Sequence, residues 1–423
     1  MTAIVRELVS LIDEAQSGAA DLLDHPRAYR ALKRALSAVH PLVTTGEVAL
    51  DVVLDALDRD ISAQVDEILH HPKLRAAESA WRGVKFVVDR VAFKENVRVE
   101  VLNCSMEDLL DDFDASPEIV KSGLYKIVYS GEYASYGGRP FGAIIANYVF
   151  GPGPADSAFL GQCGAVAACA AIPFITGFAP LPPDQPSTAI RFMMREAHRA
   201  FDSAKFVAGT WQRFAARTPF SVVTKEGARL EETARGADDR VWLCGSAIVA
   251  VAAAQSFAKW RIASDLTFAV DALDLDPPLS DALDAHLADH GVMSLARTAE
   301  GVRIASSRTW ASPRERPPLG IRGAALTDEE RALHHDLRSL FIGGRFVHYL
   351  KTLQRDRIGS WSTLDVLEQN LRAWLDGFIG HAIHDHEVKV TELPSVAWWL
   401  GLRIRAAWAP ETTVVVENKL DKE

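Results

Sequence analysis

Two long stretches of this chain are apolar on all sides and rich in small residues, and they accompany apolar, strand-like segments. Residues 158–171 consist mainly of Ala, Gly and Cys and lie between the segments 141–148 and 174–178. Residues 241–260 form a second Ala-rich run. A helix without a polar face is buried, and Gly and Ala let it approach a sheet closely. The pattern predicts a mixed α/β (α+β) fold with a layered sheet-and-helix core.

The same apolar runs are also candidates for membrane spans, but their sequence argues against this. A span needs about 20 strongly apolar residues, whereas Ser246, Gln255 and Ser256 interrupt the second run and Pro173 follows the first. The N-terminus has no basic segment leading into an apolar run, so we expect no secretory signal. Four cysteines without a CxxC pair are typical of thiols in a reducing compartment. We expect a cytoplasmic protein without membrane insertion.

The composition limits the size class and the partners. The chain has 423 residues, of which 48% are hydrophobic and 24% are charged, and its formal net charge is −10. A chain of this length exceeds the usual size of one hydrophobic core, so we expect more than one domain-sized unit. Because nucleic-acid binding needs clustered Lys and Arg, the acidic balance argues against nucleic acid as the main partner.

The N-terminal residues 1–66 have the apolar spacing of amphipathic helices. The spacing predicts a helix over Val48–Leu69, which ends before the breaker His71-Pro72. Short helices ahead of a core form either a cap on that core or an arm that docks on a partner, and the periodicity does not distinguish these alternatives.

Strict alternation predicts a strand over residues 97–103, where Val97, Val99 and Val101 share one face. Ser105 is expected to cap the helix that follows, and Asp108 to complete a capping box.

The C-terminal third predicts two helices, over 327–356 and 362–380, and then strands over 388–391, 398–408 and 412–416. The apolar face of the middle strand carries these residues: Trp398, Leu400, Leu402, Ile404, Ala406 and Trp408. Arg403 and Arg405 lie on the other face. We interpret this one-sided strand as an edge strand, which favours pairing with another chain.

The strongest candidate for chemistry is the histidine group His381, His384 and His386. Residues at i and i+3 share a helix face, so the group fits a metal site, with Asp385 or Glu387 as a further ligand. The competing interpretation is a polar linker between a helix and a strand, because no Cys or fourth ligand is close in sequence.

Other catalytic patterns do not form a coherent set. Gly151 and Gly153 resemble a phosphate loop, but Asp156 stands where a dinucleotide motif needs Gly. The sequence contains neither GxxxxGK[ST] nor GxSxG. We therefore expect no catalytic residues, no cofactor and no metal, and an assembly role rather than an enzyme.

Several motifs in order resemble the large subunit of the type VI secretion contractile sheath, the TssC/VipB family. The motifs are the segment Ile61–Pro72 with its His-His-Pro end, Glu78–Gly83, Val101–Leu110, Ser122–Tyr125 followed by Gly137–Gly142, Asp202–Phe214, Arg345–Lys351 and Arg355–Ser360. The similarity runs from about residue 58 to the end of the chain.

The resemblance implies a structural protein that forms a protomer with a small sheath subunit of the TssB/VipA type. Such protomers stack into a helical tube around an inner tube of Hcp type, start from a baseplate, and contract. A separate AAA+ ATPase acts on the contracted sheath, and strands at the chain ends are exchanged between neighbouring large subunits. A sheath subunit of a related contractile injection device stays open as an alternative, as does, less strongly, a metal-binding enzyme.

The resemblance also implies a division of the chain. We expect residues 1–66 to be a helical arm that docks the small subunit, 67–385 the α/β sheath core, and 386–423 a strand extension for an inter-subunit sheet. The candidate interface residues are Ile61, Val65, Trp398, Leu400, Leu402, Arg403, Ile404, Arg405 and Trp408.

Overall fold

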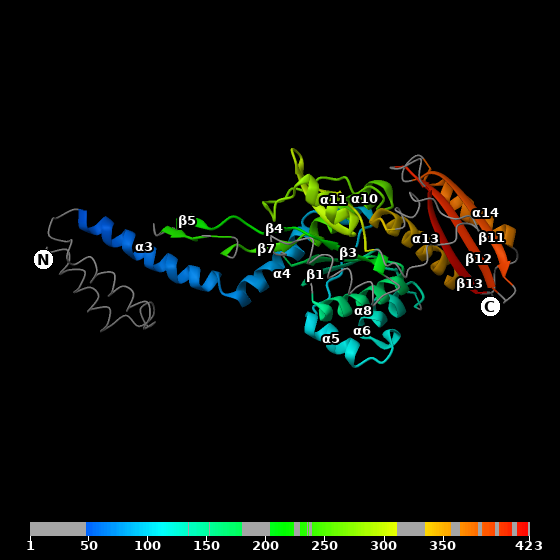
Figure 1. The fold of residues 1–423 in the computed structure, drawn as a ribbon, viewed down its shortest axis with the longest axis horizontal. Coiled ribbons are helices and arrows are strands. Elements are labelled where there is room, and N and C mark those ends of the chain that lie inside the picture. Colours follow the sequence, from blue (N-terminus) through cyan, green and yellow to red (C-terminus); the bar gives the residue numbers. More distant parts are fainter. Residues whose placement is uncertain are drawn as a thin grey trace. The chain divides into compact units, whose positions relative to one another are not determined.

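The computed structural model describes residues 48–133, 135–151, 153–179, 204–223, 229–234, 236, 239–310, 335–356, 364–379, 383–393, 397–407 and 413–421 (Figure 1). Helices and both parallel and antiparallel sheets are present in these residues, which confirms the predicted mixed α/β class. The chain divides into two compact units. The first comprises Met1–Ser79 and Ala216–Val241, and the second Ala80–Ala215 and Trp242–Glu423.

The first unit is built on the long helix α3 (Val48–Leu69) and a hairpin of β5 (Ser221–Val223) and β6 (Arg229–Glu231), which lies beside it in Figure 1. Three α3 side chains bond the backbone of β6 and its continuation. Asp58 accepts from Arg229 N–H (3.0 Å), Ser62 accepts from Glu231 N–H (3.2 Å), and Asp66 accepts from Thr233 N–H (3.1 Å). Four helical residues rise about 6 Å and two strand residues about 6.7 Å, so the two repeats match. The helix thus takes the place of a neighbouring strand.

A partly buried ion cluster holds the base of this hairpin. The guanidinium of Arg217 bonds Glu78 (2.7 Å) and both oxygens of Glu232, which also accepts from Phe220 N–H at 2.9 Å. Burial by itself would raise the pKa of Glu232, but the bonds from Arg217 and Phe220 outweigh it and lower that pKa below its ordinary value. Glu232 therefore stays ionised at neutral pH.

A five-stranded sheet forms the core of the second unit, in the order β1-β2-β3-β9-β10. Its strands are β1 (Ile144–Phe150), β2 (Phe174–Phe178), β3 (Val207–Thr210), β9 (Val292–Thr298) and β10 (Gly301–Ser306). The first four run parallel and β10 is antiparallel. A mainly parallel sheet needs helices on both faces.

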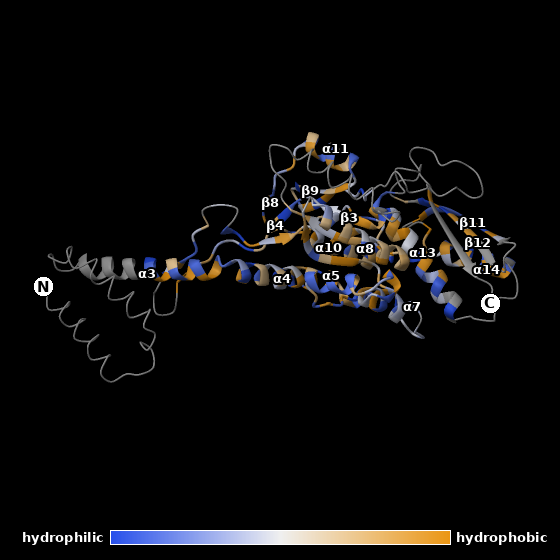
Figure 2. Cartoon of the chain, turned by 60° about the horizontal axis from the view of Figure 1, so that its bottom comes forward, coloured by the Kyte–Doolittle hydropathy of each residue, from blue (hydrophilic) through white to orange (hydrophobic). Residues whose placement is uncertain are grey.

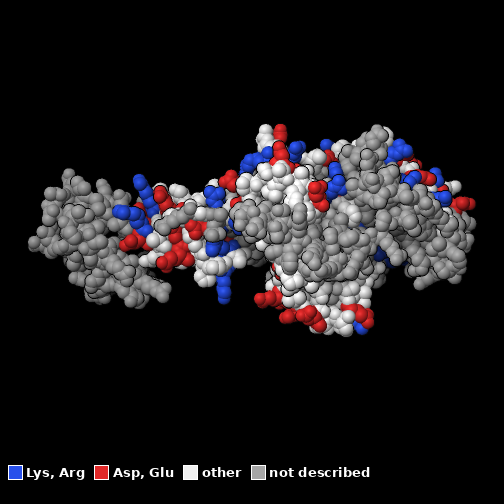
Figure 3. All heavy atoms as spheres, viewed as in Figure 1, with Lys and Arg blue, Asp and Glu red and all other residues white. Residues whose placement is uncertain are grey.

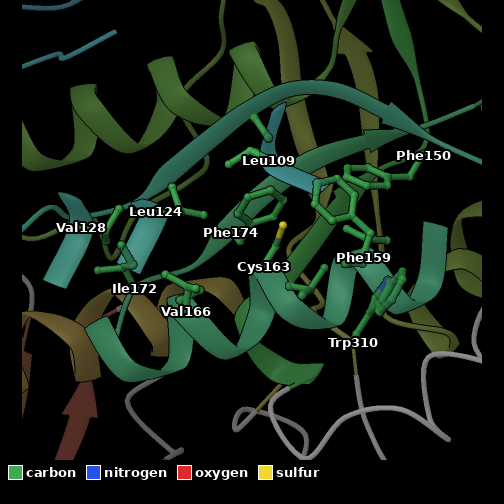
Figure 4. Close-up of a cluster of buried hydrophobic side chains, with 14 of the residues drawn as sticks. Leu109, Leu124, Val128, Phe150, Phe159, Cys163, Val166, Ile172, Phe174 and Trp310 are labelled. Carbon is green, nitrogen blue, oxygen red and sulfur yellow. The ribbon is translucent and has the colours of Figure 1, made fainter. Parts of the chain in front are cut away.

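The two apolar runs of the sequence supply these covering helices, α8 (Pro154–Ala170) and α10 (Ser246–Trp260), and Figure 2 shows both as largely hydrophobic. Phe159 and Cys163 of α8 share a core cluster with Phe174 of β2, as Figure 4 shows. Ile175 lies on the opposite face of β2, on which α10 contacts the sheet. Burial on both sides explains why neither helix has a polar face.

The remaining elements of the second unit surround this core. The helices are α4 (Pro72–Val88, whose first residues belong to the first unit), α5 (Met106–Asp114), α6 (Gly123–Tyr125), α7 (Gly131–Tyr133) and α11 (Asp281–Asp289), and Lys126–Ser130 is a π-helical turn. Short 3-10 turns span Phe93–Glu95, Ile119–Lys121 and Ala204–Phe206. A small sheet has the order β7-β4-β8, with β4 (Arg213–Ala215), β7 (Trp242–Cys244) and β8 (Leu275–Asp276).

The C-terminal part is a three-stranded antiparallel sheet with two helices on one face. The strands are β11 (Ile383–Leu393), β12 (Ala397–Ala406) and β13 (Thr413–Asp421), and the helices are α13 (Leu337–Asp356) and α14 (Leu364–Asp376). Leu371 of α14, Phe346 of α13 and Leu402 of β12 share a second core cluster.

Most predicted elements are confirmed, and one is wrong. The helix Val48–Leu69, the strand Phe174–Phe178 and the Ser105 capping box are as expected. Residues 97–103 have no strand neighbour among the described residues, so the strand predicted there is absent. The cysteines are thiols, as expected. The helices predicted before residue 40, and the start of the one predicted from 327, lie outside the described residues.

Candidate assembly surfaces

The outer edge of β1 is the main unpaired backbone surface of the five-stranded sheet. In the described part of the chain, β1 has β2 as its single strand neighbour. Ile144 N–H donates to Pro173 O (2.9 Å), and Phe150 O accepts from Ala179 N–H (2.8 Å), so both residues point their backbone groups toward β2. Backbone groups alternate along a strand, so those of Ile145 and Val149 point outward.

Exposed apolar residues lie on β1 and on the extended segment that Tyr148 ties to it. The side chains of Ile145 and Val149 are 37% and 49% exposed. The hydroxyl of Tyr148 donates to Cys104 O (2.6 Å), which holds the end of the extended segment 97–104 beside β1. That segment presents Val101 and Leu102, which are 61% and 52% exposed.

The backbone groups of β1 that face β2 have hydrogen-bond partners within the chain. The pairing with β2 is irregular between Ile145 and Val149. Hydroxyl groups fill this irregularity, because Ser246 donates to Ala146 O and Thr176 donates to Tyr148 O, each at 3.1 Å. Unpaired backbone therefore remains at the outer edge of β1 and not at its inner one.

The two interface candidates of the N-terminal arm, Ile61 and Val65, are half-buried. They lie on α3 next to Ser62 and Asp66, whose side chains bond the hairpin. This side of α3 is therefore occupied within the chain itself, and the role of Ile61 and Val65 toward a partner stays a prediction.

The prediction that β12 is an edge strand is wrong for the chain by itself. β11 pairs with one side of β12 and β13 with the other, so β12 is the middle strand. Leu400, Leu402 and Ile404 are buried in the cluster beneath α13 and α14. Their alternation reflects this internal core, because an edge strand and a middle strand share the same one-sided pattern. Exchange of these strands between subunits stays a prediction.

The opposite face of β12 is polar, as expected. Arg405 forms an exposed ion pair with Asp385 of β11 at 3.6 Å. Arg403 lies between Glu387 and Val415 in register, and its Nε is buried without a hydrogen-bond partner among the described residues. The Trp398 side chain and Trp408 lie outside the described residues, so the interface role of this group is untested.

The histidine group does not form a metal site in the described residues. His384 and His386 lie in β11, not on a helix, so the helical spacing argument fails. The Nε2 of His386 lies 2.9 Å from a carboxylate oxygen of Asp376, and His381 is outside the described residues. Within the described ranges, no three His, Cys, Asp or Glu side chains are placed to hold a metal ion. The same ranges contain no helix long and apolar enough to cross a membrane.

Comparison with known proteins identifies the two parts of the chain. Residues 51–181 match the family model VipB, described as EvpB/VC_A0108, tail sheath N-terminal domain. Residues 327–394 match a second model, described as EvpB/VC_A0108, tail sheath gpW/gp25-like domain. The chain is thus similar to tail sheath proteins of the VipB family in two segments, which follow each other along the chain. The N-terminal match contains α4 to α8 with β1, and the C-terminal match contains α13, α14 and β11.

A curated relative is also a sheath protein. The chain is 27% identical to the type VI secretion system sheath protein TssC1 of Pseudomonas aeruginosa, over 88% of this chain and 84% of that protein. Among solved structures, it is similar to a sheath tail protein from Desulfitobacterium hafniense, with a TM-score of 0.32 and 12% identity. That similarity covers 62% of this chain and spans 59% of the other.

A polar seam joins the two VipB-family domains within the second unit. Three residues on one face of α13 bond carbonyl oxygens near the end of α8, in α7 and in the loop that follows α7. His348 lies 3.0 Å from Ala170 O, Lys351 donates to Cys169 O (3.3 Å), and Arg355 donates to Glu132 O (3.1 Å) and Ser135 O (2.9 Å). The Lys351 ammonium at the C-terminus of α8 interacts favourably with the negative end of that helix dipole.

The sequence pointed to some of these residues without giving their roles. The motif Arg345–Lys351 contains His348, but the pattern does not reveal that it meets α8. The alternation at 97–103 placed Val101 on one face with Val97 and Val99, but it did not show that Val101 is exposed. Nothing in the apolar run of β1 distinguishes an edge strand from a central one, so Ile145 and Val149 were missed.

Proposed function

We propose that this chain is a structural large subunit of the type VI secretion contractile sheath. In this proposal it assembles with a small sheath subunit and with further copies of itself into a helical tube that contracts to propel an inner tube. The observation that carries the proposal is the match to both tail sheath domains in order along one chain. The similarity to a sheath protein over most of its length supports it.

The architecture suits a subunit that moves as a rigid body. Contraction requires subunits that repack between two arrangements while each keeps its own fold. Helices α8 and α10 pack on the parallel sheet. Hydrogen bonds from α13 connect the C-terminal domain to α8. Such a subunit stores energy in its contacts with neighbours, so the proposal assigns it no catalytic residue, cofactor or metal.

The proposal extends to the cell and to further partners. We place the assembled sheath in the cytoplasm, around an inner tube of Hcp type and on a baseplate. A separate AAA+ ATPase is expected to take the contracted sheath apart. These assignments rest on the likeness to the sheath family and not on a contact in the structure.

Co-expression tests the proposal directly. The chain is produced with the small sheath subunit encoded beside it, and the material is viewed by negative-stain electron microscopy. We expect tubes of variable length with a cogwheel cross-section, and no such tubes from the chain alone. Discrete monomers with and without the partner would refute the proposal.

A further inference from the structure

We propose that the loop 135–139 of one copy docks on the outer face of α5 in a second copy of this chain, through Tyr136 and Arg139. We call residues 135–139 the docking loop. This inference rests on the proposed function, since a tube of sheath subunits needs contacts between copies. It concerns two surfaces of the second unit, and it is separate from the arm 1–66 and from the predicted exchange of C-terminal strands.

Hydrogen bonds at both ends fix the backbone of the docking loop. The guanidinium of Arg355 on α13 donates to Ser135 O (2.9 Å) and Gly138 O (3.3 Å). The carboxylate of Glu132 accepts from Arg139 N–H at 2.5 Å. A Cβ at Gly138 would meet the carbonyl oxygen of Glu132, so the turn needs glycine at this position. The loop is therefore a defined turn and not a flexible connection.

This turn presents an aromatic ring and a positive charge. Tyr136 is 93% exposed and lies beside Gly137, whose φ of +80° suits glycine. A tyrosine on a fixed backbone loses little conformational entropy when a partner buries it, and tyrosines are accordingly frequent in protein interfaces. Arg139 is also exposed, and its guanidinium has no carboxylate partner in the described part of the chain.

The outer face of α5 offers the complementary groups. Glu107, Asp111 and Asp114 recur at the spacing of one helix face. Leu110, which is 42% exposed, lies among them and provides an apolar contact for a ring. Within the described ranges, none of the three carboxylates forms an ion pair. Figure 3 shows acidic side chains over the region that Figure 1 labels α5.

Two of these carboxylates oppose the dipole of their own helix. Asp111 and Asp114 lie in the last turn of α5, which contains no basic residue. The C-terminal end of a helix carries partial negative charge, so acidic side chains are unfavourable there. Asp112 in the same turn is used within the chain, because it accepts from Gly123 N–H (2.7 Å) and Leu124 N–H (3.2 Å). A cation from a partner would offset the unfavourable position of the other two carboxylates.

The two surfaces fit a contact between copies that does not close. Figure 2 shows α5 apart from α7, which the docking loop follows, in the layer of short helices. A loop that meets a different face of the next copy gives a head-to-tail contact, and this contact repeats from copy to copy. Because both complementary surfaces lie on this chain, a second copy is favoured over a different protein as the partner.

The first test exchanges the charges of the two surfaces in the full chain, co-expressed with the small sheath subunit. We expect Arg139→Glu and Asp111→Arg each to lower the yield of tubes in electron micrographs by on the order of tenfold, since like charges then meet in the contact. The chain with both substitutions should recover tubes, because the pair is restored with its signs exchanged. Lys94→Glu is the matched control. Lys94 is exposed in the 3-10 turn Phe93–Glu95 and belongs to neither surface, so this variant should form tubes as the unaltered chain does.

The second test identifies the partner by crosslinking. A photoreactive phenylalanine derivative is placed at the exposed position of Ser135, beside Tyr136, and assembled tubes are irradiated. An adduct of two copies of this chain, mapped to α5 by mass spectrometry, supports the inference. A crosslink to the small subunit or the absence of an adduct between copies overturns it. Full tube yield from both single variants, or no recovery in the double variant, overturns it as well. If the unaltered chain forms no tubes, the proposed function itself fails.

Discussion

The seam residue His348 provides the sharpest test of the energetics. It lies on α13, is buried, and bonds the carbonyl oxygen of Ala170 at the end of α8. Burial lowers its pKa from 6.5 to about 4, and the nearby charges of Arg345 and Lys351 add to this effect, while the bond to Ala170 opposes it. The imidazole is therefore neutral in the folded chain near pH 7.

The sign of the pH dependence follows from this lowered pKa. As the pH falls below 6.5, the unfolded chain takes up a proton at this histidine and the folded chain does not. The folded state loses stability progressively until the pH reaches about 4. A difference of some two and a half pKa units corresponds to about 3 kcal/mol at the acid end of that range.

The measurement compares the unaltered protein with His348→Gln, whose amide can still donate to Ala170 O but does not titrate. Urea unfolding of the small-subunit complex at several pH values, followed by tryptophan fluorescence, gives the free energy of unfolding for each. All other titratable groups are the same in both proteins, so the difference between their free energies of unfolding reports on His348. We expect the difference in the free energy of unfolding between the unaltered protein and His348→Gln to change by about 3 kcal/mol between pH 7 and pH 4. Parallel curves would show that the histidine is not held neutral in the seam.

Four further outcomes are expected. Arg217→Ala leaves two partly buried carboxylates, Glu78 and Glu232, without their cation and should destabilise the first unit by about 3 kcal/mol in thermal unfolding. Lys85→Ala, at an exposed pair in the second unit, should change the stability of that unit by less than about 1 kcal/mol. Asp66→Ala removes one rung between α3 and β6 and should cost about 1 kcal/mol, seen as faster amide exchange at residues 229–233. Leu402→Pro removes a ladder donor from the middle of a sheet and should abolish tubes in electron micrographs, so intact tubes would contradict the pairing described for β12. Chelator treatment and His384→Ala should both leave the melting temperature unchanged. Stoichiometric metal found by elemental analysis would contradict this expectation and support a metal site.

Local signals in the sequence located many of the elements. The periodicity of α3, the capping box at Ser105 and the apolar strand Phe174–Phe178 depend on neighbours within a few residues, so the sequence contains what is needed to predict them. The apolar character of α8 and α10 also predicted helices buried against a sheet. The ordered motifs indicated the family for the same reason, because each of them is a run of neighbouring residues.

The placement of strands within a sheet was beyond the sequence, as three segments show. Among the described residues, 97–103 alternate like a strand but have no strand neighbour, and β1 is an edge strand. The one-sided strand β12 lies in the middle of its sheet. Alternation records which side chains are buried, and it is the same for an edge strand as for a central one. The hydrogen-bond partners of a strand lie far along the chain or on another chain, so the tertiary structure alone decides which backbone edges are left for a partner.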